Sequence, residues 1–542
     1  MLAMIRYPVF AFAVILLAVS GCASGSAPRG SGGPAPLLKD LGDHEHPITT
    51  ASTAAQRYFN QGLTLGFAFN HAEAQRSFRY AATLDPQCAM CWWGIAFVLG
   101  PNVNATMDAA AAAPAWEAVR KAQSLAATTT PREQAYIAAV AQRYAEQPPA
   151  DRAPLDTAFA SAMRDVARQY PDDLDASALF AEALMDLTPW NYYRSGGTPL
   201  RPETTEIVTT LESVLRRDPK HAWAIHLYIH ATEASDNPAR AESYADTLAS
   251  LVPGAGHLVH MPAHTYLRIG RYHDAVLANE RATAADHAYI SQCHAQGAYP
   301  ATYVPHNHHF LYAAASMAGS SAGALRGAAG TGATDHKTAH DASPGAQHLA
   351  AQPLFAFVRF GKWQEILDTA APPGDMVYRT GVWHYARGRA FVGTGQLDRA
   401  AAELAALKKM AGKDEPRKAV LDVAREVLAG EITARQGNAA EAVAHLEKGV
   451  ELEDAMRYGE PADWLYPVRH SLGAVLLAAG QAPKAEAVYR EDLRRNPENG
   501  WALYGLMQAL DAQGNKAESA EVRQRFDKAW AHADIALTAS RI

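Results

Sequence analysis

Residues 55–86 read AQRYFNQGLTLGFAFNHAEAQRSFRYAATLDP, and the second half of this stretch decides the fold. Ala74, Phe78 and Ala81 place a small, a large and a small side chain on one helical face, and Pro86 then ends the helix. The pattern returns along the chain, with repeats that start at Ala55, Ala89, Ala222 and Gly256, near residues 381, 423 and 466, and near Gly500. Such a repeat predicts a stack of helical hairpins, because each hairpin leaves an apolar face that only a neighbour can cover.

These residues resemble the tetratricopeptide (TPR) repeat, in which small and large side chains recur at fixed positions of two helices. Trp92 falls at a position where that family often has Trp. Strand signals are nearly absent, since the sequence has few β-branched runs and no Asn-Gly turns between alternating segments. The resemblance covers roughly residues 55–530. It implies an all-α, TPR-type solenoid of helical hairpins, wound as a right-handed superhelix.

The amino-acid composition excludes several classes of protein. Of 542 residues, 49% are hydrophobic and 19% are charged, which supplies a large core and excludes a mainly disordered chain. The formal net charge of −7 gives no basic surface, so we expect no nucleic-acid partner. The 4 cysteines exclude a disulfide scaffold. Cys88 and Cys91, in the order Cys-Ala-Met-Cys, are interpreted as a local disulfide or as two packed thiols, with a redox or metal motif as the further alternative.

The N-terminus is interpreted as a targeting segment. Arg6 precedes an apolar stretch that is too short to span a membrane, so residues 1–21 are expected to be a signal peptide. The Val-Ser-Gly-Cys sequence that ends at Cys22 resembles the bacterial lipobox, in which the cysteine thiol is acylated. The alternative is an ordinary signal with a chance cysteine. The resemblance implies a lipid anchor on Cys22, and Ala23 in place of Asp implies the outer membrane, facing the periplasm.

The whole chain therefore resembles the bacterial TPR lipoproteins. The expected organisation is a signal peptide (1–21), a flexible tether (22–48), an N-terminal TPR array with a His-rich groove (49–325), a loose loop (326–346) and a C-terminal TPR array (347–542). Pro305, followed by apolar residues, predicts a helix start, and residues 287–304 are then an insert before it.

Histidines are concentrated in one part of the chain, since twelve of the 22 lie within residues 221–309. His226 and His260 are 34 residues apart, as are His230 and His264, which is one TPR period. The family resemblance places these positions of each first helix on the concave groove. The same register gives the complete predicted cluster: His226, His230, His257, His260, His264, His306 and His309.

Imidazoles from neighbouring packed helices could share one cation, and the sequence therefore predicts a metal site. Outside the cytoplasm, Zn or Cu is the expected ion for a cluster rich in imidazole. Glu233 is the candidate general base, and Arg268 is the candidate anchor for an anionic substrate. No nucleophile motif indicates a reaction, so whether the protein is an enzyme stays open.

Two other interpretations of the cluster remain. The imidazoles could line a groove for an organic anion or a peptide, or they could be purely structural. A TPR match normally implies a scaffold that binds a protein or peptide partner, and this is the alternative function. The C-terminal repeats form no titratable cluster and are expected to be scaffold or partner-binding surface.

Overall fold

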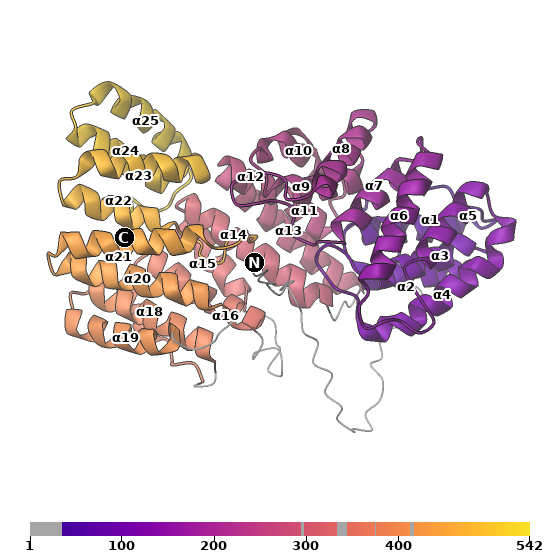
Figure 1. Cartoon of the computed structure of the whole chain (residues 1–542), viewed down its shortest axis with the longest axis horizontal. Coiled ribbons are helices and arrows are strands. Elements are labelled where there is room, and N and C mark those ends of the chain that lie inside the picture. The colour runs from indigo at the N-terminus through magenta and orange to yellow at the C-terminus, as the bar shows by residue number, and fades with distance from the viewer. Residues whose placement is uncertain (1–34, 294–297, 333–343, 374–375, 412–416) are drawn as a thin grey trace, which may run out of the picture. The chain divides into compact units, whose positions relative to one another are not determined.

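The computed structural model describes residues 35–293, 298–332, 344–373, 376–411 and 417–542 (Figure 1). The predicted signal peptide, Cys22 and residues 22–34 of the predicted tether lie outside the described residues. Within the described part of the chain, no helix is long and apolar enough to cross a membrane.

The all-α prediction is confirmed. The described regular structure consists of α-helices with short 3-10 turns at Ala109–Ala111, Ala126–Thr128 and Pro238–Ala241, and the only β contacts among these residues are two isolated bridges. The chain forms two compact units. Unit 1 comprises the described residues of Met1–Pro262 with Ala284–Tyr299, and unit 2 those of Ala263–Thr283 with Pro300–Ile542.

Unit 1 is a succession of helical hairpins. Its helices are α1 (Thr53–Phe67), α2 (His71–Leu84), α3 (Ala89–Leu99), α4 (Ala112–Leu125), α5 (Pro131–Ala141), α6 (Ala153–Gln169), α7 (Leu174–Met185), α8 (Pro202–Arg217), α9 (Ala222–Thr232), α10 (Glu242–Leu251) and α11 (Gly256–His260). The repeats predicted at Ala89, Ala222 and Gly256 start where α3, α9 and α11 begin.

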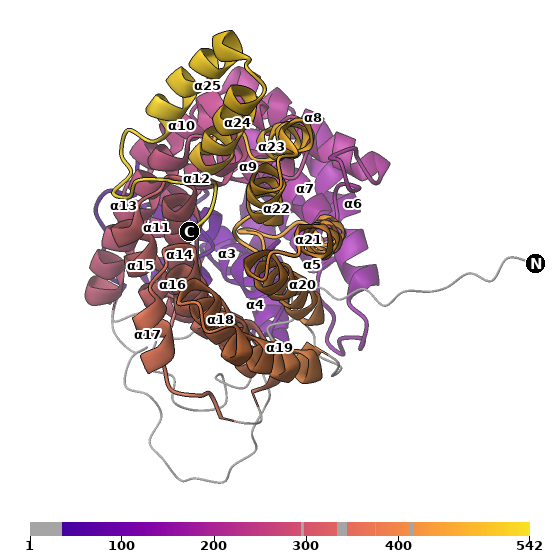
Figure 2. The same cartoon turned by 90° about the vertical axis from the view of Figure 1, so that its left-hand side faces the viewer.

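Unit 2 continues the hairpin pattern. Its helices are α15 (Ser321–Gly330), α16 (Pro344–Arg359), α17 (Trp363–Asp368), α18 (Val377–Gly393), α19 (Leu397–Ala411), α20 (Lys418–Arg435), α21 (Ala439–Asp454), α22 (Val468–Ala478), α23 (Ala482–Arg495), α24 (Gly500–Ala512) and α25 (Lys516–Ala529). Three further helices fall at the division of the chain: α12 (Pro262–Ile269), α13 (Tyr272–Cys293) and α14 (Ala298–Met317). Figure 2 shows α18 to α25 following one another in chain order.

The predicted small–large seam is the contact that joins successive hairpins. In unit 1 the ring of Phe78 lies between Gly62 and Gly94, where an added Cβ would come within 2.7 Å and 2.6 Å of it. In unit 2 Tyr489 lies in the same way between Gly473 and Gly505. Glycine is therefore needed at these four positions, because an aromatic ring occupies the space of a side chain.

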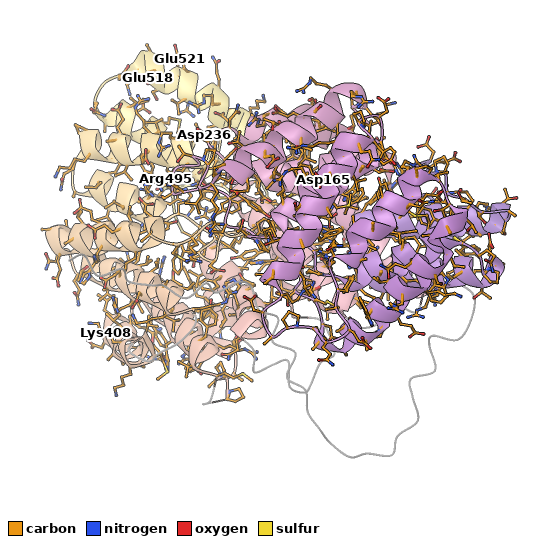
Figure 3. The ribbon with its side chains drawn as sticks, turned by 45° about the vertical axis from the view of Figure 1, so that its right-hand side comes forward. Asp165, Asp236, Lys408, Arg495, Glu518 and Glu521 are labelled. Carbon is orange, nitrogen blue, oxygen red and sulfur yellow. A yellow bond between two sulfur atoms is a disulfide. The ribbon has the colours of Figure 1, made fainter. Side chains whose placement is uncertain are left out.

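Charged side chains such as Asp165 and Lys408 are exposed on the outer surface (Figure 3).

The segment around Pro305 differs from the prediction. Helix α14 begins at Ala298, so Pro305 lies inside the helix and does not start it. Residues 287–293 of the predicted insert belong to α13, and residues 294–297 lie outside the described residues. Of the predicted loop 326–346, residues 326–330 belong to α15 and residues 333–343 are not described.

Residues 35–48, the described part of the predicted tether, are held against unit 1. The carboxylate of Asp175 accepts from His46 Nδ1 at 2.6 Å and from His44 Nε2 at 3.2 Å, and His221 Nε2 lies 3.1 Å from its other oxygen. We call these four residues the Asp175 cluster. Burial would raise the pKa of Asp175, but hydrogen bonds from His221, His44 and His46 hold this pKa well below 3.8.

The two neighbouring cysteines form a disulfide at the start of α3. Cys88 and Cys91 are joined and fully buried. Cys88 is also the N-cap of α3, and its sulfur accepts from the Cys91 N–H at 3.1 Å. Of the interpretations of this pair, the local disulfide is the one that the structure contains. Cys293 carries a free, buried thiol.

Candidate metal centre

Helix α9 supplies two of the predicted histidines. The ring of His221 caps the helix, because its Nδ1 accepts from the Ala224 N–H at 3.2 Å. His226 and His230 follow on one face of the helix, one turn apart, and every residue of α9 is buried. Since α9 is otherwise mainly apolar, these two imidazoles are polar groups placed in a dry interior.

A hydrogen bond of His226 fixes the tautomer of its ring. Its Nδ1 lies 2.7 Å from the main-chain oxygen of Phe67, which is the last residue of α1. A carbonyl oxygen only accepts, so Nδ1 must carry the proton. In the neutral ring, Nε2 then keeps its lone pair and faces away from Phe67.

His230 is oriented in a similar way by a carboxylate. Its Nδ1 lies 3.1 Å from Glu233 Oε1, and both side chains are fully buried. Glu233 caps the C-terminus of α9, so the backbone places this partner one turn beyond the histidine. An ionised carboxylate accepts from Nδ1–H, which leaves Nε2 of His230 as the ring nitrogen with a lone pair.

His257 comes from α11 and completes the group. Its Nε2 lies 3.1 Å from Nε2 of His226. Its backbone N–H donates to the Tyr299 hydroxyl at 3.1 Å, and that hydroxyl donates to Asp286 at 2.8 Å. One ring nitrogen from each of His226, His230 and His257 lies within 4.8 Å of the others, and all three side chains are buried. We call these three residues the His226 cluster.

Aromatic rings enclose the His226 cluster. The ring of Phe69 lies 4.6 Å from His226 and 5.4 Å from His257, and the ring of Trp190 meets His230 edge-on at 5.0 Å. Phe69 and Trp190 also have positive φ values of 56° and 61°, which are rare for residues with a side chain. Strained backbone of this kind gathers at functional sites, and here both strained aromatic residues contact imidazoles of the His226 cluster.

The remaining predicted ligands are placed differently. His260 stacks on His257 with ring centroids 5.8 Å apart. In unit 2, His264 Nδ1 lies 3.0 Å from Glu460 Oε2, and the rings of His264 and His306 are 5.7 Å apart. His309 instead packs against His348 at 5.5 Å. Burial, together with the nearby positive charge of Arg417, lowers the pKa of His309 to about 3.

The two predicted catalytic residues belong to different units. Glu233 contacts His230 in unit 1. Arg268, in unit 2, lies over the ring of Tyr458 at 5.7 Å. Their roles as general base and substrate anchor stay predictions.

Several groups near the candidate site carried no usable sequence signal. The oxygen of Phe67 is a main-chain atom, so no residue type marks it in advance. Tyr299 and Asp286 reach His257 only through tertiary packing. His44 and His46 are far from Asp175 in sequence and meet it because residues 35–48 fold back on unit 1. Of these groups, only His44 and His46 were visible as a local His-Glu-His pattern.

No family model matches the sequence, and neither does any curated protein. Among solved structures, the chain is similar to the human IFIT1 dimer with m7Gppp-AAAA, at 12% identity over 89% of this chain and 91% of that chain, with a TM-score of 0.32. It is also similar to the P58(IPK) TPR domain, at 12% identity over 85% of this chain and 99% of that chain, with a TM-score of 0.24.

Proposed function

We propose that this protein binds a metal ion, Zn or Cu, through His226, His230 and His257. One observation carries the proposal: Nδ1 of His226 and Nδ1 of His230 are both occupied by acceptors, the Phe67 oxygen and the Glu233 carboxylate. Metal-binding histidines are characteristically held in this way, because the second-shell acceptor fixes the tautomer and directs the other nitrogen at the ion.

The distances support the same conclusion. Two imidazole nitrogens bound to a tetrahedral zinc at its usual bond length lie about 3.3 Å apart. The separation of the His226 and His257 Nε2 atoms is 3.1 Å, within a few tenths of an ångström of that value. One shared cation accounts for the approach of all three rings, whereas a hydrogen bond from His257 Nε2–H accounts only for the contact between His226 and His257.

Three imidazoles would leave one coordination position for water or substrate, which is the arrangement of catalytic zinc sites. In this proposal Glu233 is the positioning residue of His230, because the same carboxylate already contacts Nδ1. A catalytic activity would require that water or substrate, and no further protein side chain, occupies the fourth coordination position of the metal ion. The predicted lipid anchor on Cys22 would place the protein at the outer membrane, facing the periplasm.

The test is metal content, measured by mass spectrometry on protein purified without a His tag, before and after a chelator. We expect nearly one ion per cluster in the unaltered chain and its loss in the double variant His226→Ala/His257→Ala. His445→Ala is the matched control, because that half-buried histidine binds Glu426 at 2.7 Å and belongs to no candidate metal group among the described residues. Absence of metal, together with no melting shift on adding Zn or Cu, would overturn the proposal.

A peptide-binding role is the second candidate, and one observation favours it. Residues 534–542 form no helix or strand and contact several repeats of unit 2. Asp534 accepts from the first N–H groups of α15, Ser540 donates to the His470 oxygen at 2.7 Å, and Arg541 pairs with Glu431. Repeats that hold a non-helical segment of their own chain offer the contacts that a partner peptide would use.

A further inference from the structure

A buried arginine in unit 2 lacks a counter-charge. Arg359, the last residue of α16, is only 5% exposed. Its guanidinium lies 3.6 Å from the centre of the Trp501 ring and 5.5 Å from that of Tyr466. Its Nη1 donates to His470 Nδ1 at 3.2 Å. Among the described residues, no carboxylate comes within ion-pair distance of this guanidinium, and its Nε and Nη2 atoms have no hydrogen-bond partner.

The nearest acidic side chain is already committed. His470 Nε2 donates to Asp492 at 3.0 Å, and the same carboxylate accepts from Asn499 at 3.0 Å. Histidine therefore stands between the arginine and this acid. Burial lowers the pKa of Arg359 to about 9, which reports how poorly the surrounding protein compensates the charge.

A small cavity opens beside Arg359. Its volume is about 20 Å³, and it is lined by Arg359, Arg389, Tyr466, His470, Ser471 and Arg541, among others. A space of this size accommodates about one water-sized group. An oxygen of an anion fits it, whereas a large organic ligand does not.

The charge around the cavity is positive. Arg389 lies 3.6 Å from Glu431, and Arg541 pairs with the same carboxylate. Two guanidinium groups thus share one acidic side chain, and the third, that of Arg359, has none within ion-pair distance in the described part of the chain. Burial, together with the positive charge of Arg389, lowers the pKa of Arg541 to about 10. Buried charge without compensation is strongly unfavourable, so the cavity favours an incoming anion.

We propose that Arg359 binds a small oxyanion, a phosphate or a carboxylate, through Nε and Nη2, with one oxygen of the anion in this cavity. These two N–H groups form the edge of the guanidinium that matches two oxygens of such an anion. Arg389 and Arg541 supply further positive charge, and the Trp501 and Tyr466 rings hold the guanidinium plane in place. The proposal rests on unit 2 alone and is independent of the metal site.

The test uses the full chain with defined anions. Thermal melting is followed while inorganic phosphate, acetate or chloride is added at constant ionic strength. We expect a saturable rise of about 3 °C with phosphate or acetate at a large excess over the dissociation constant, and none with chloride. The phosphate and acetate arms distinguish the two kinds of anion. The absence of a saturable rise with both anions overturns the proposal.

Two variants locate the site. Arg359→Met should abolish the anion-dependent rise and, without anion, should melt no lower than the parent, because an uncompensated buried charge is removed. Arg399→Met is the control, since this exposed arginine also lies over an aromatic ring, Phe391, at 4.0 Å. Should Arg359→Met fail to fold, Arg541→Met should still weaken the anion affinity about tenfold. An unchanged rise in a folded Arg359→Met protein, or an unchanged affinity in Arg541→Met, overturns the assignment.

Discussion

The Nε2 atoms of His226 and His257 lie 3.1 Å apart, although the two residues belong to different helices. The proton on Nδ1 of His226 is committed to the Phe67 oxygen, so its Nε2 is an acceptor. Nε2 of His257 must then either donate a proton across the gap or share a cation with His226. Metal binding would displace that proton, and metal affinity should therefore fall as the pH is lowered.

Glu233→Gln should weaken metal binding by roughly 10–100-fold, because the carboxylate that orients His230 is lost while the three imidazoles remain. Competition with a coloured chelator gives the affinity. Glu146→Gln, an exposed change in the same unit, should leave it unaltered. Equal affinities in the parent and Glu233→Gln would show that Glu233 has no part in orienting a ligand.

Asp175→Ala should release residues 35–48 from unit 1 and cost about 3 kcal/mol, because three histidines lose a common buried acceptor. Hydrogen exchange in residues 38–48 measures the release. Asp165→Ala is the exposed control, and protection that is equal in both variants would contradict the prediction.

The Asp175 cluster predicts that residues 35–48 are held against unit 1 most firmly within a limited pH range. The pKa of Asp175 is depressed, so its stabilisation is present above 3.8 and is lost as the pH falls through the folded value. Burial would lower the pKa of His44, but the hydrogen bond and charge of Asp175 outweigh burial and raise it. The contribution of His44 is therefore complete below 6.5 and is lost as the pH rises through its folded pKa. Protection of residues 38–48, taken as the exchange rate relative to the intrinsic rate at each pH, should be greatest between these limits and should fall as the pH rises through the folded pKa of His44.

Glu182→Gln should stabilise the protein at alkaline pH. Burial raises the pKa of Glu182, and the charge of Asp186 adds to the effect. The folded state then binds more protons than the unfolded state above 4.5, so stability falls as the pH rises toward the folded pKa. A glutamine keeps an acceptor for Trp223 Nε1, which donates to Glu182 at 2.9 Å, and carries no charge.

The expected gain for Glu182→Gln is on the order of 2 kcal/mol at pH 8.5, and little or none at pH 4. Melting temperatures across this range provide the measurement. Glu203→Gln, an exposed change, should give a profile parallel to that of the parent. A Glu182→Gln protein that is less stable than the parent at pH 8.5 would refute the prediction.

Gly94→Ala should destabilise the protein by about 1–3 kcal/mol, because the new Cβ would lie 2.6 Å from the Phe78 ring. A loss of stability would be informative, because replacing glycine by alanine inside a helix otherwise stabilises it by about 1 kcal/mol. Gly345→Ala, where a Cβ meets nothing within 4 Å, should be neutral or stabilising. Denaturant unfolding of both variants decides the matter, and a stable Gly94→Ala protein would mean that Phe78 can move.

Much of the architecture could be predicted from the sequence because the repeat is local. The seam residues Ala74, Phe78 and Ala81 are close in sequence, and the same period set the starts of α3, α9 and α11. The prediction that Pro305 starts a helix is wrong, because the residue lies inside α14. Proline at the first position of a helix is a preference, and its fixed φ also fits a helix interior where the missing N–H is tolerated.

The candidate site was only partly predictable. The 34-residue spacing could place His226 and His260 in equivalent helices, but it could not say which imidazoles would meet. His257 reaches His226, whereas His309 packs on His348, because the long helix α14 carries its own register from Ala298. The Phe67 oxygen could not be foreseen, since the final turn of α1 becomes an acceptor only after packing.

The docking of residues 35–48 sets the reach of an anchored molecule. A tether that extended freely from Cys22 to residue 48 could span about 90 Å at full stretch. With Ala35 buried and the Asp175 cluster closed, only the residues between Cys22 and Ala35 remain, which limits the span to about 45 Å. If Cys22 carries the proposed lipid, this span limits how far unit 1 could lie from the bilayer, and opening the cluster would double that distance.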